Sequence, residues 1–416
     1  MSLSYRKPAS LRLAISSACT LLAAAVLPAG AALAADTYVQ PQVDLRVEAN
    51  DNWDLVPGGS ADSDVYGYVA DLQALIGIAT PRSDTSMRPR ILLQEYPDRS
   101  DIDAFEAFFD VRSQYNWERS NLFVLARYQR QDIVNYNRPV AGFDEFDPNA
   151  PPVADSGRSR ANETLNRVDI SPTFTFNLSE RTRIGAAAYY QAARYNSDGV
   201  QTSVDYDYAQ GSGFFTRVLG PRNDVTLDAY VSKYEPTDSS TETVGTGGGI
   251  GYKHRWSEIA GIEGRVFYEQ NDIDRFEPVR TQESTSGWGG NVTSYLNGPV
   301  SQWRVTVEQA FYPTGDGGKQ ENTQFRAQYG RALTQRWNFD GAALYLRARA
   351  ISTNFKLDDR DYARLDVSLR WALTRTFYLS GGYSYTWQEY VVSRGSADNN
   401  RLFVSFGYQG LAGPGH

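Results

Sequence analysis

Cysteine, histidine and methionine are almost missing from this chain. Its 416 residues include one Cys, two His and two Met. So few ligands and nucleophiles leave little material for a disulfide framework, a zinc site or a histidine-based catalytic centre. The low mean hydropathy of -0.48 excludes a helical multi-span membrane protein, which needs repeated runs of roughly 20 apolar residues. We therefore expect no enzyme activity, no metal and no cofactor.

A surplus of basic charge is also lacking. Lys and Arg number 41 against 49 Asp and Glu, which gives a net charge of -8. Because phosphate binding needs a basic face, this balance argues against nucleic acid as a partner. Aromatic residues make up 13% of the chain, and 27 of them are Tyr. Disordered chains are poor in aromatics, so the composition indicates a folded protein.

The first 34 residues have the layout of a secretory signal peptide. Arg6, Lys7 and Arg12 form a basic start, and an Ala- and Leu-rich apolar stretch follows from Leu13 to Leu27. Ala32-Leu33-Ala34 then places small residues where signal peptidase requires them. We predict cleavage after this triplet, with 1–34 as signal and 35–416 as the mature domain. The only cysteine, Cys19, would leave with the signal.

The remaining chain alternates apolar and polar residues with a period of two, which is typical of strands with two different faces. Between Tyr362 and Leu373, for example, Leu365 and Val367 fall on one face and Arg364 and Asp366 on the other. We expect one all-β domain with eighteen strands. Their approximate cores are 38–50, 65–79, 87–96, 103–117, 121–132, 164–177, 182–195, 203–218, 224–234, 243–255, 260–270, 285–296, 302–312, 322–332, 337–350, 361–373, 376–389 and 400–410.

Short and long connections alternate along the chain. Turns such as Ser179-Glu180-Arg181 and Thr334-Gln335 lie between longer links such as 51–64 and 133–163. This rhythm predicts a single transmembrane antiparallel β-barrel in a bacterial outer membrane, with both termini in the periplasm. Segments of about 10–14 residues suffice for a tilted crossing, which takes about 9–11. A β-propeller would repeat a motif every 40–50 residues or so, and we find none.

With eighteen strands a barrel is too wide for side chains to fill, so the apolar faces should contact lipid and the polar faces should line a water-filled lumen. Nearly all the basic residues are Arg. Two interpretations of the lumen arginines stay open: cross-strand pairs with acids that brace the wall, and a track for an anionic solute. The candidate solute-binding residues are Arg347, Arg349, Arg364, Arg370, Arg326, Arg304, Arg265, Arg183, Arg112 and Arg90.

The chain resembles the beta-barrel porin-2 type of bacterial outer-membrane proteins, which are associated with exopolysaccharide gene systems. The resemblance rests on the first strand running into Asn50-Asp51-Asn52, and on turn phrases such as Leu178-Ser179-Glu180-Arg181-Thr182 and Leu333-Thr334-Gln335-Arg336-Trp337. It implies a channel that exports an extracellular polysaccharide with the help of a periplasmic polysaccharide-export protein.

The alternative function is a diffusion porin for small hydrophilic solutes. A porin of this kind should have a loop folded into its lumen, and the long link 133–163 is the candidate for that constriction loop. The two functions are therefore distinguished by whether a long loop of this kind folds into the lumen.

Overall fold

The computed structural model describes residues 36–55, 64–133, 163–197, 203–237, 241–276, 281–315, 318–351, 359–391 and 395–411. The chain divides into two units, Met1–Asp36 and Thr37–His416, and only the second is described below. The predicted signal peptide lies outside the described residues, as does the expected constriction loop apart from its two end residues. No helix in the described ranges is long and apolar enough to cross a membrane.

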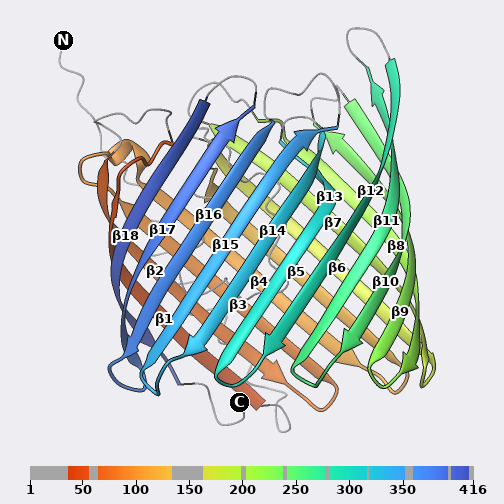
Figure 1. Ribbon diagram of the computed structural model, residues 1–416, viewed down its shortest axis with the longest axis horizontal. Coiled ribbons are helices and arrows are strands. Elements are labelled where there is room, and N and C mark those ends of the chain that lie inside the picture. The colour runs from red at the N-terminus through yellow and green to blue at the C-terminus, as the bar shows by residue number, and fades with distance from the viewer. Residues whose placement is uncertain are drawn as a thin grey trace, which may run out of the picture. The chain divides into compact units, whose positions relative to one another are not determined.

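The described part of the second unit is an antiparallel β-barrel of eighteen strands, as the sequence predicts (Figure 1). Each strand pairs with its neighbours in the chain, and β1 pairs with both β2 and β18, which closes the barrel. A single 3-10 turn, η1 (Ser100–Ile102), interrupts the β3–β4 connection. The strands are β1 (Asp36–Asn50), β2 (Val65–Ala79), β3 (Ser83–Glu95), β4 (Ala104–Asn116), β5 (Ser120–Asp132), β6 (Glu163–Ser179), β7 (Thr182–Ser197), β8 (Tyr206–Gly220), β9 (Asn223–Pro236), β10 (Thr241–Arg255), β11 (Ala260–Arg275), β12 (Thr281–Asn297), β13 (Ser301–Pro313), β14 (Lys319–Ala332), β15 (Trp337–Ala350), β16 (Arg360–Ala372), β17 (Phe377–Tyr390) and β18 (Gly395–Gln409).

All eighteen predicted segments correspond to strands, and the differences lie at their ends. The strand β18 begins at Gly395, where the sequence pattern predicts 400. Strands β11 and β12 form a hairpin that extends to Arg275 and starts again at Thr281, where the sequence pattern predicts 270 and 285. Polar residues such as Gln270, Asp272 and Ser284 blur the alternation there. They are nevertheless held in register by cross-strand hydrogen bonds, because Ser284 Oγ donates to the Asp272 carboxylate at 2.8 Å.

The connections differ at the two ends of the barrel. At one end, here called the turn end, strands are joined by tight turns that run along the lower rim in Figure 1. Two of these turns share one chemistry: Thr334 Oγ1 accepts the N–H of Trp337 at 3.1 Å, and Thr374 Oγ1 accepts the N–H of Phe377 at 3.0 Å. The opposite end, called the loop end, carries the longer connections.

Both ends of the barrel chain lie at the turn end, because Gln42 near the start of β1 pairs with Gln409 at the end of β18. The assignment of this end to the periplasm stays a prediction.

The outer face of the barrel is apolar. Leu365 on β16 and Leu402 on β18 are 46% and 61% exposed, and their neighbours along each strand point inward. Aromatic side chains pair across strands at two heights of this face. Trp337 and Trp371 stack at 5.6 Å close to the turn end, while Tyr268 and Trp288 meet edge to face at 5.3 Å toward the loop end. An apolar belt between two aromatic levels is the surface of a barrel embedded in lipid.

The inner face has two unlike halves. Near the loop end, inward polar side chains such as Glu106, Asn271 and Arg360 are at most 1% exposed. Near the turn end the inward side chains of Arg183 and Arg255 are about 40% exposed. The lumen is therefore open to water at the turn end and closely lined at the loop end.

The strict alternation in β16 predicts unequal costs for a buried charge on its two faces. Leu365→Arg, on the lipid side, should lower the free energy of unfolding by about 2–4 kcal/mol, because a charge near the membrane midplane loses its hydration. Ser368→Arg, on the inner face of the same strand, is the matched control and should cost much less. Reversible urea unfolding in lipid vesicles measures both changes. Equal losses for the two variants would reject this orientation of the faces.

Candidate functional site in the lumen

One hairpin leaves the barrel wall near the loop end. The register between β12 and β13 stops at Gly290 and Gln309, although β12 continues with β11 to its first residue, Thr281. On its other side β13 stays paired with β14 as far as Pro313 and Lys319. The end of the β13–β14 hairpin therefore separates from β12 and follows a path of its own.

This hairpin end folds into the lumen and is attached to the wall formed by β7–β11. We call residues 313–315, 318 and 319 the inturned tip. Tyr234 on β9 donates its hydroxyl hydrogen to the Thr314 carbonyl at 3.0 Å, and the N–H of Val204 donates to the Gly315 carbonyl at 2.7 Å. A Cβ at Gly315 would lie 2.5 Å from the Tyr195 hydroxyl, so this close approach requires glycine.

Lys319 supplies the strongest attachment of the inturned tip. Its ammonium nitrogen, Nζ, donates to Asn271 Oδ1 at 2.8 Å, Glu269 Oε1 at 3.1 Å and Ser232 Oγ at 3.2 Å. All four side chains are buried, with Lys319 only 4% exposed. A lysine charge is stable without water only when its donors are satisfied in this way. Lys319 thus joins the tip of one hairpin to β9 and β11, across the intervening strand β12.

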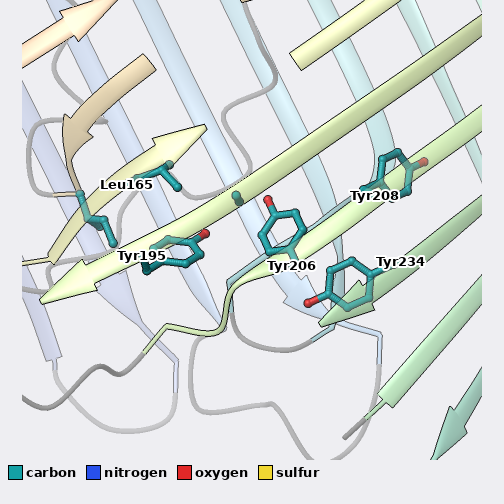
Figure 2. Packing of buried hydrophobic residues seen from close by; sticks show 7 residues of the cluster. Leu165, Tyr195, Tyr206, Tyr208 and Tyr234 are labelled. Carbon is teal, nitrogen blue, oxygen red and sulfur yellow. The ribbon is translucent and has the colours of Figure 1, made fainter. Parts of the chain in front are cut away.

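The wall that receives the inturned tip is built from tyrosines. Tyr195, Tyr206 and Tyr234 come from three neighbouring strands and lie in a row with Leu165 and Tyr208 (Figure 2). The rings of Tyr206 and Tyr234 are 5.3 Å apart. Such a row gives a rigid apolar surface whose hydroxyl groups can still donate hydrogen bonds.

The sequence pattern did not locate this constriction. The expected loop, 133–163, lies outside the described residues, whereas the inturned tip belongs to the link 313–321. The contacts of Lys319 join residues 48, 50 and 87 positions apart. Because strand periodicity carries no information about such distant pairs, no local signal could have indicated the tip.

The predicted arginines fall into three groups, and the first is paired with acids on the inner wall. Arg90 holds Asp71 with two hydrogen bonds of 3.0 Å, and Arg265 Nε donates to Asp228 at 2.8 Å. Arg364 donates to both carboxylate oxygens of Asp366 at 2.6 Å. These arginines brace the wall, as the first of the two sequence interpretations proposed.

A second group lies close to the turn end with little or no acidic pairing. Arg183 is 4.0 Å from Asp224. Arg112 and Arg370 lie over the rings of Phe123 and Tyr378, at 5.2 and 4.6 Å. Arg304 faces inward opposite Tyr295 and Gln328. Within the described ranges no carboxylate lies at ion-pair distance from Arg112, Arg304 or Arg370, and Arg370 interacts with the Asp340 carboxylate over a longer distance. Arg326 also faces inward, between Thr306 and Leu344.

Two of the ten predicted site residues are on the wrong face. Arg347 and Arg349 on β15 point outward near the loop end, because Leu346 and Ala348 between and beside them are fully buried on the inner side. Arg349 donates to the carbonyls of Ala348 and Arg360 and to Asp361, each at 2.8 Å. The prediction failed because it assigned every apolar residue to lipid, whereas the closely lined loop half also accepts apolar side chains inside.

A basic cavity opens beside the second group. It has a volume of about 370 Å³ and lies between the first five strands. Arg88 and Arg127 both approach the carboxylate of Asp110, at 2.9 and 3.7 Å, and Arg112 borders the same cavity. A lining rich in guanidinium groups has the chemistry that suits a small anion. Among the described residues no cluster of three or more His, Cys, Asp and Glu side chains is placed to hold a metal ion.

The closed barrel, its apolar belt and its polar lumen define the class of the protein. It is a transmembrane β-barrel channel of the bacterial outer membrane, as predicted from the sequence.

No family model and no curated protein matches the chain. OccAB3 of Acinetobacter baumannii aligns at 10% identity over 90% of this chain and 99% of its own, with a TM-score of 0.44. OccK2 (OpdF) of Pseudomonas aeruginosa, solved with glucuronate, aligns at 10% identity over 90% of this chain and 99% of its own, with a TM-score of 0.45. OpdK of Pseudomonas aeruginosa, solved with vanillate, aligns at 9% identity over 89% of this chain and 98% of its own, with a TM-score of 0.43. Similarities this distant say nothing about the solute, and the argument about the solute rests on the lumen of this chain.

The attachment of the inturned tip predicts a large stability loss at Lys319. Lys319→Met leaves Glu269 buried without its cation and should cost about 3–5 kcal/mol of unfolding free energy. Lys253→Met is the matched control, since Lys253 pairs with Glu263 at 3.0 Å but both side chains are well exposed, and it should cost less than about 1 kcal/mol.

Adding Glu269→Gln to Lys319→Met removes the orphaned charge and should recover most of the loss. Urea unfolding of the wild type and the three variants in vesicles measures these differences. A Lys319→Met protein as stable as the wild type would show that the lysine does not secure the tip.

Proposed function

We propose that the protein is a passive diffusion channel for small hydrophilic solutes, with a preference for anions. The observation that carries this proposal is the inturned tip, which crosses part of the lumen and is attached to the β7–β11 wall by five hydrogen bonds. A channel with an attached internal segment selects by size. This property suits a diffusion porin.

The preference for anions follows from where the charges are free. Acids on the inner wall near the loop end form ion pairs with arginines, as Asp71 does with Arg90 and Asp366 with Arg364. Arg112, Arg304 and Arg370 near the turn end form no ion pair within the described ranges, although Arg370 interacts with the more distant Asp340 carboxylate. Unpaired positive charge in a confined aqueous space raises the local concentration of anions. Contacts of this kind are weak enough for a solute to leave again.

Polysaccharide export, the function implied by the resemblance, requires a wider lumen than the diffusion of small solutes does. A polymer needs an unobstructed path through both halves for many sugar residues at once, and the buried inner wall of the loop half leaves little free surface for it. A periplasmic export protein would be required as a partner for that function only. The geometry therefore favours small solutes over a polymer.

Neutralising the free arginines should reduce the anion preference. We expect the triple variant Arg112→Gln, Arg304→Gln and Arg370→Gln to shift the reversal potential of a planar bilayer under a salt gradient toward that of an unselective pore. The matched control is Arg347→Gln, which removes an outward-facing arginine and should leave the reversal potential unchanged. If the triple variant stays as anion-selective as the wild type, the preference has another origin.

A deletion strain separates the two candidate functions in the cell. We expect loss of the protein to slow the uptake of small anionic nutrients and to leave secreted polysaccharide at its normal amount. The measurement is growth on limiting organic acids beside a quantitative assay of extracellular polysaccharide. Loss of the polysaccharide with normal nutrient uptake would contradict the diffusion channel and establish export in its place.

A further inference from the structure

A second cavity, in the wall beneath the inturned tip, differs in character from the basic one. Its volume is about 270 Å³, and it is lined by aromatic rings from β7–β9, β11 and β13. We call it the aromatic pocket and define it by Tyr189, Tyr208, Tyr230, Phe267 and Tyr312. Nothing in the proposed anion preference requires it.

The charges around the aromatic pocket cancel. Arg167 Nε donates to Asp169 at 2.8 Å, Arg265 is held by Asp228, and Lys319 by Glu269. Glu308, the remaining acid of the lining, has Arg326 beside it. A pocket with internally compensated charges does not attract an ion, so its ligand is uncharged.

The tyrosine hydroxyls are also engaged. Tyr230 donates to Glu269 at 2.7 Å, Tyr189 to Asp169 at 2.7 Å and Tyr208 to Gln210 at 2.8 Å. Each hydroxyl fixes the direction of its ring. The Arg265 guanidinium lies over the rings of Tyr230 and Phe267, at 5.5 and 4.6 Å from their centroids, and Lys319 Nζ lies over Tyr208 at 5.6 Å. These rings border the cavity with the surface that the cations leave uncovered. Tyr230 and Phe267 stand edge to face at 6.3 Å, and Tyr189 and Tyr208 are tilted at 5.9 Å.

Amide groups complete the chemistry of the pocket. Gln210 uses its side-chain oxygen to accept from Tyr208, and its amide nitrogen makes no hydrogen bond within the described residues. Asn291, partly exposed on β12, likewise has no side-chain hydrogen bond there. Fixed aromatic faces with a few free amide donors and acceptors match a ligand that has apolar C–H faces and a rim of hydroxyls.

We propose that the aromatic pocket is a binding subsite for a single uncharged sugar ring. Its volume lies just below the range of pockets for drug-sized ligands, which leaves room for one ring. The ring can be a free neutral sugar or the uncharged part of an anionic solute drawn in by the turn-end arginines. This proposal rests on the channel function above, since a solute would bind in the aromatic pocket while it passes through the lumen.

Equilibrium binding tests the subsite without relying on conduction. Glucose is titrated by calorimetry into the purified full-length barrel in detergent, and we expect saturable binding with a dissociation constant on the order of millimolar. Tyr230→Ala should weaken it roughly tenfold, the value of one aromatic contact. Tyr230→Phe keeps the ring and should bind as the wild type does. The matched control is Tyr268→Ala on the outer face of β11, which should also leave binding unchanged.

Sorbitol, an open-chain polyol with similar hydroxyls, should not bind in the same range. Absence of saturable glucose binding, wild-type affinity in folded Tyr230→Ala protein, or equal binding of sorbitol would each overturn the subsite. The variant Arg112→Gln separates this proposal from the proposed function, because it should alter ion selectivity and leave glucose binding as it is. A wild-type barrel that binds glucose but conducts no solutes would contradict the channel and retain the subsite.

Discussion

The closure of the sheet by backbone hydrogen bonds is the constraint on which the rest of the structure depends. Inside a bilayer no water is available to satisfy an open strand edge, so the sheet has to close on itself through β1 and β18. Closure fixes which residues face lipid and which face the lumen, and it places both strand ends of the barrel at the turn end. Between β12 and β13 the ladder stops at Gly290 and Gln309, so the loop-end part of β12, which includes Trp288, pairs with β11 alone.

That interruption gives the lumen its asymmetry. Once β13 and β14 are free of β12, their hairpin can bend inward until Thr314 and Lys319 meet the tyrosine and acid groups of the neighbouring wall. The inner side chains of the loop half are buried as a result of such close contacts, while the turn half keeps water and unpaired arginines. In the proposed channel, size selection and charge selection therefore belong to different heights of one lumen.

The architecture could be predicted from the sequence because it depends on local pattern. Alternation in β16 assigns Arg364 and Leu365 to opposite faces, and the rhythm of turns gives eighteen strands and closure. The site was predicted in part: eight of the ten chosen arginines face the lumen. Arg347 and Arg349 were assigned to the wrong face because Leu346 and Ala348 are apolar, and the alternation pattern places apolar residues on the lipid side. In the closely lined half of the barrel these two residues face inward. The inturned tip escaped prediction because Lys319 finds its partners on strands that are distant in the chain.

The most direct test of the central claim is the exclusion limit of the pore, measured with graded polyethylene glycols in a planar bilayer. A lumen narrowed by the inturned tip predicts that the shortest oligomers enter and lower the conductance, whereas longer ones are excluded and leave it unchanged. The Lys319→Met variant should admit longer oligomers than the wild type. If long polymers enter the wild-type pore as readily as short ones, the tip does not constrict the lumen and the account is contradicted.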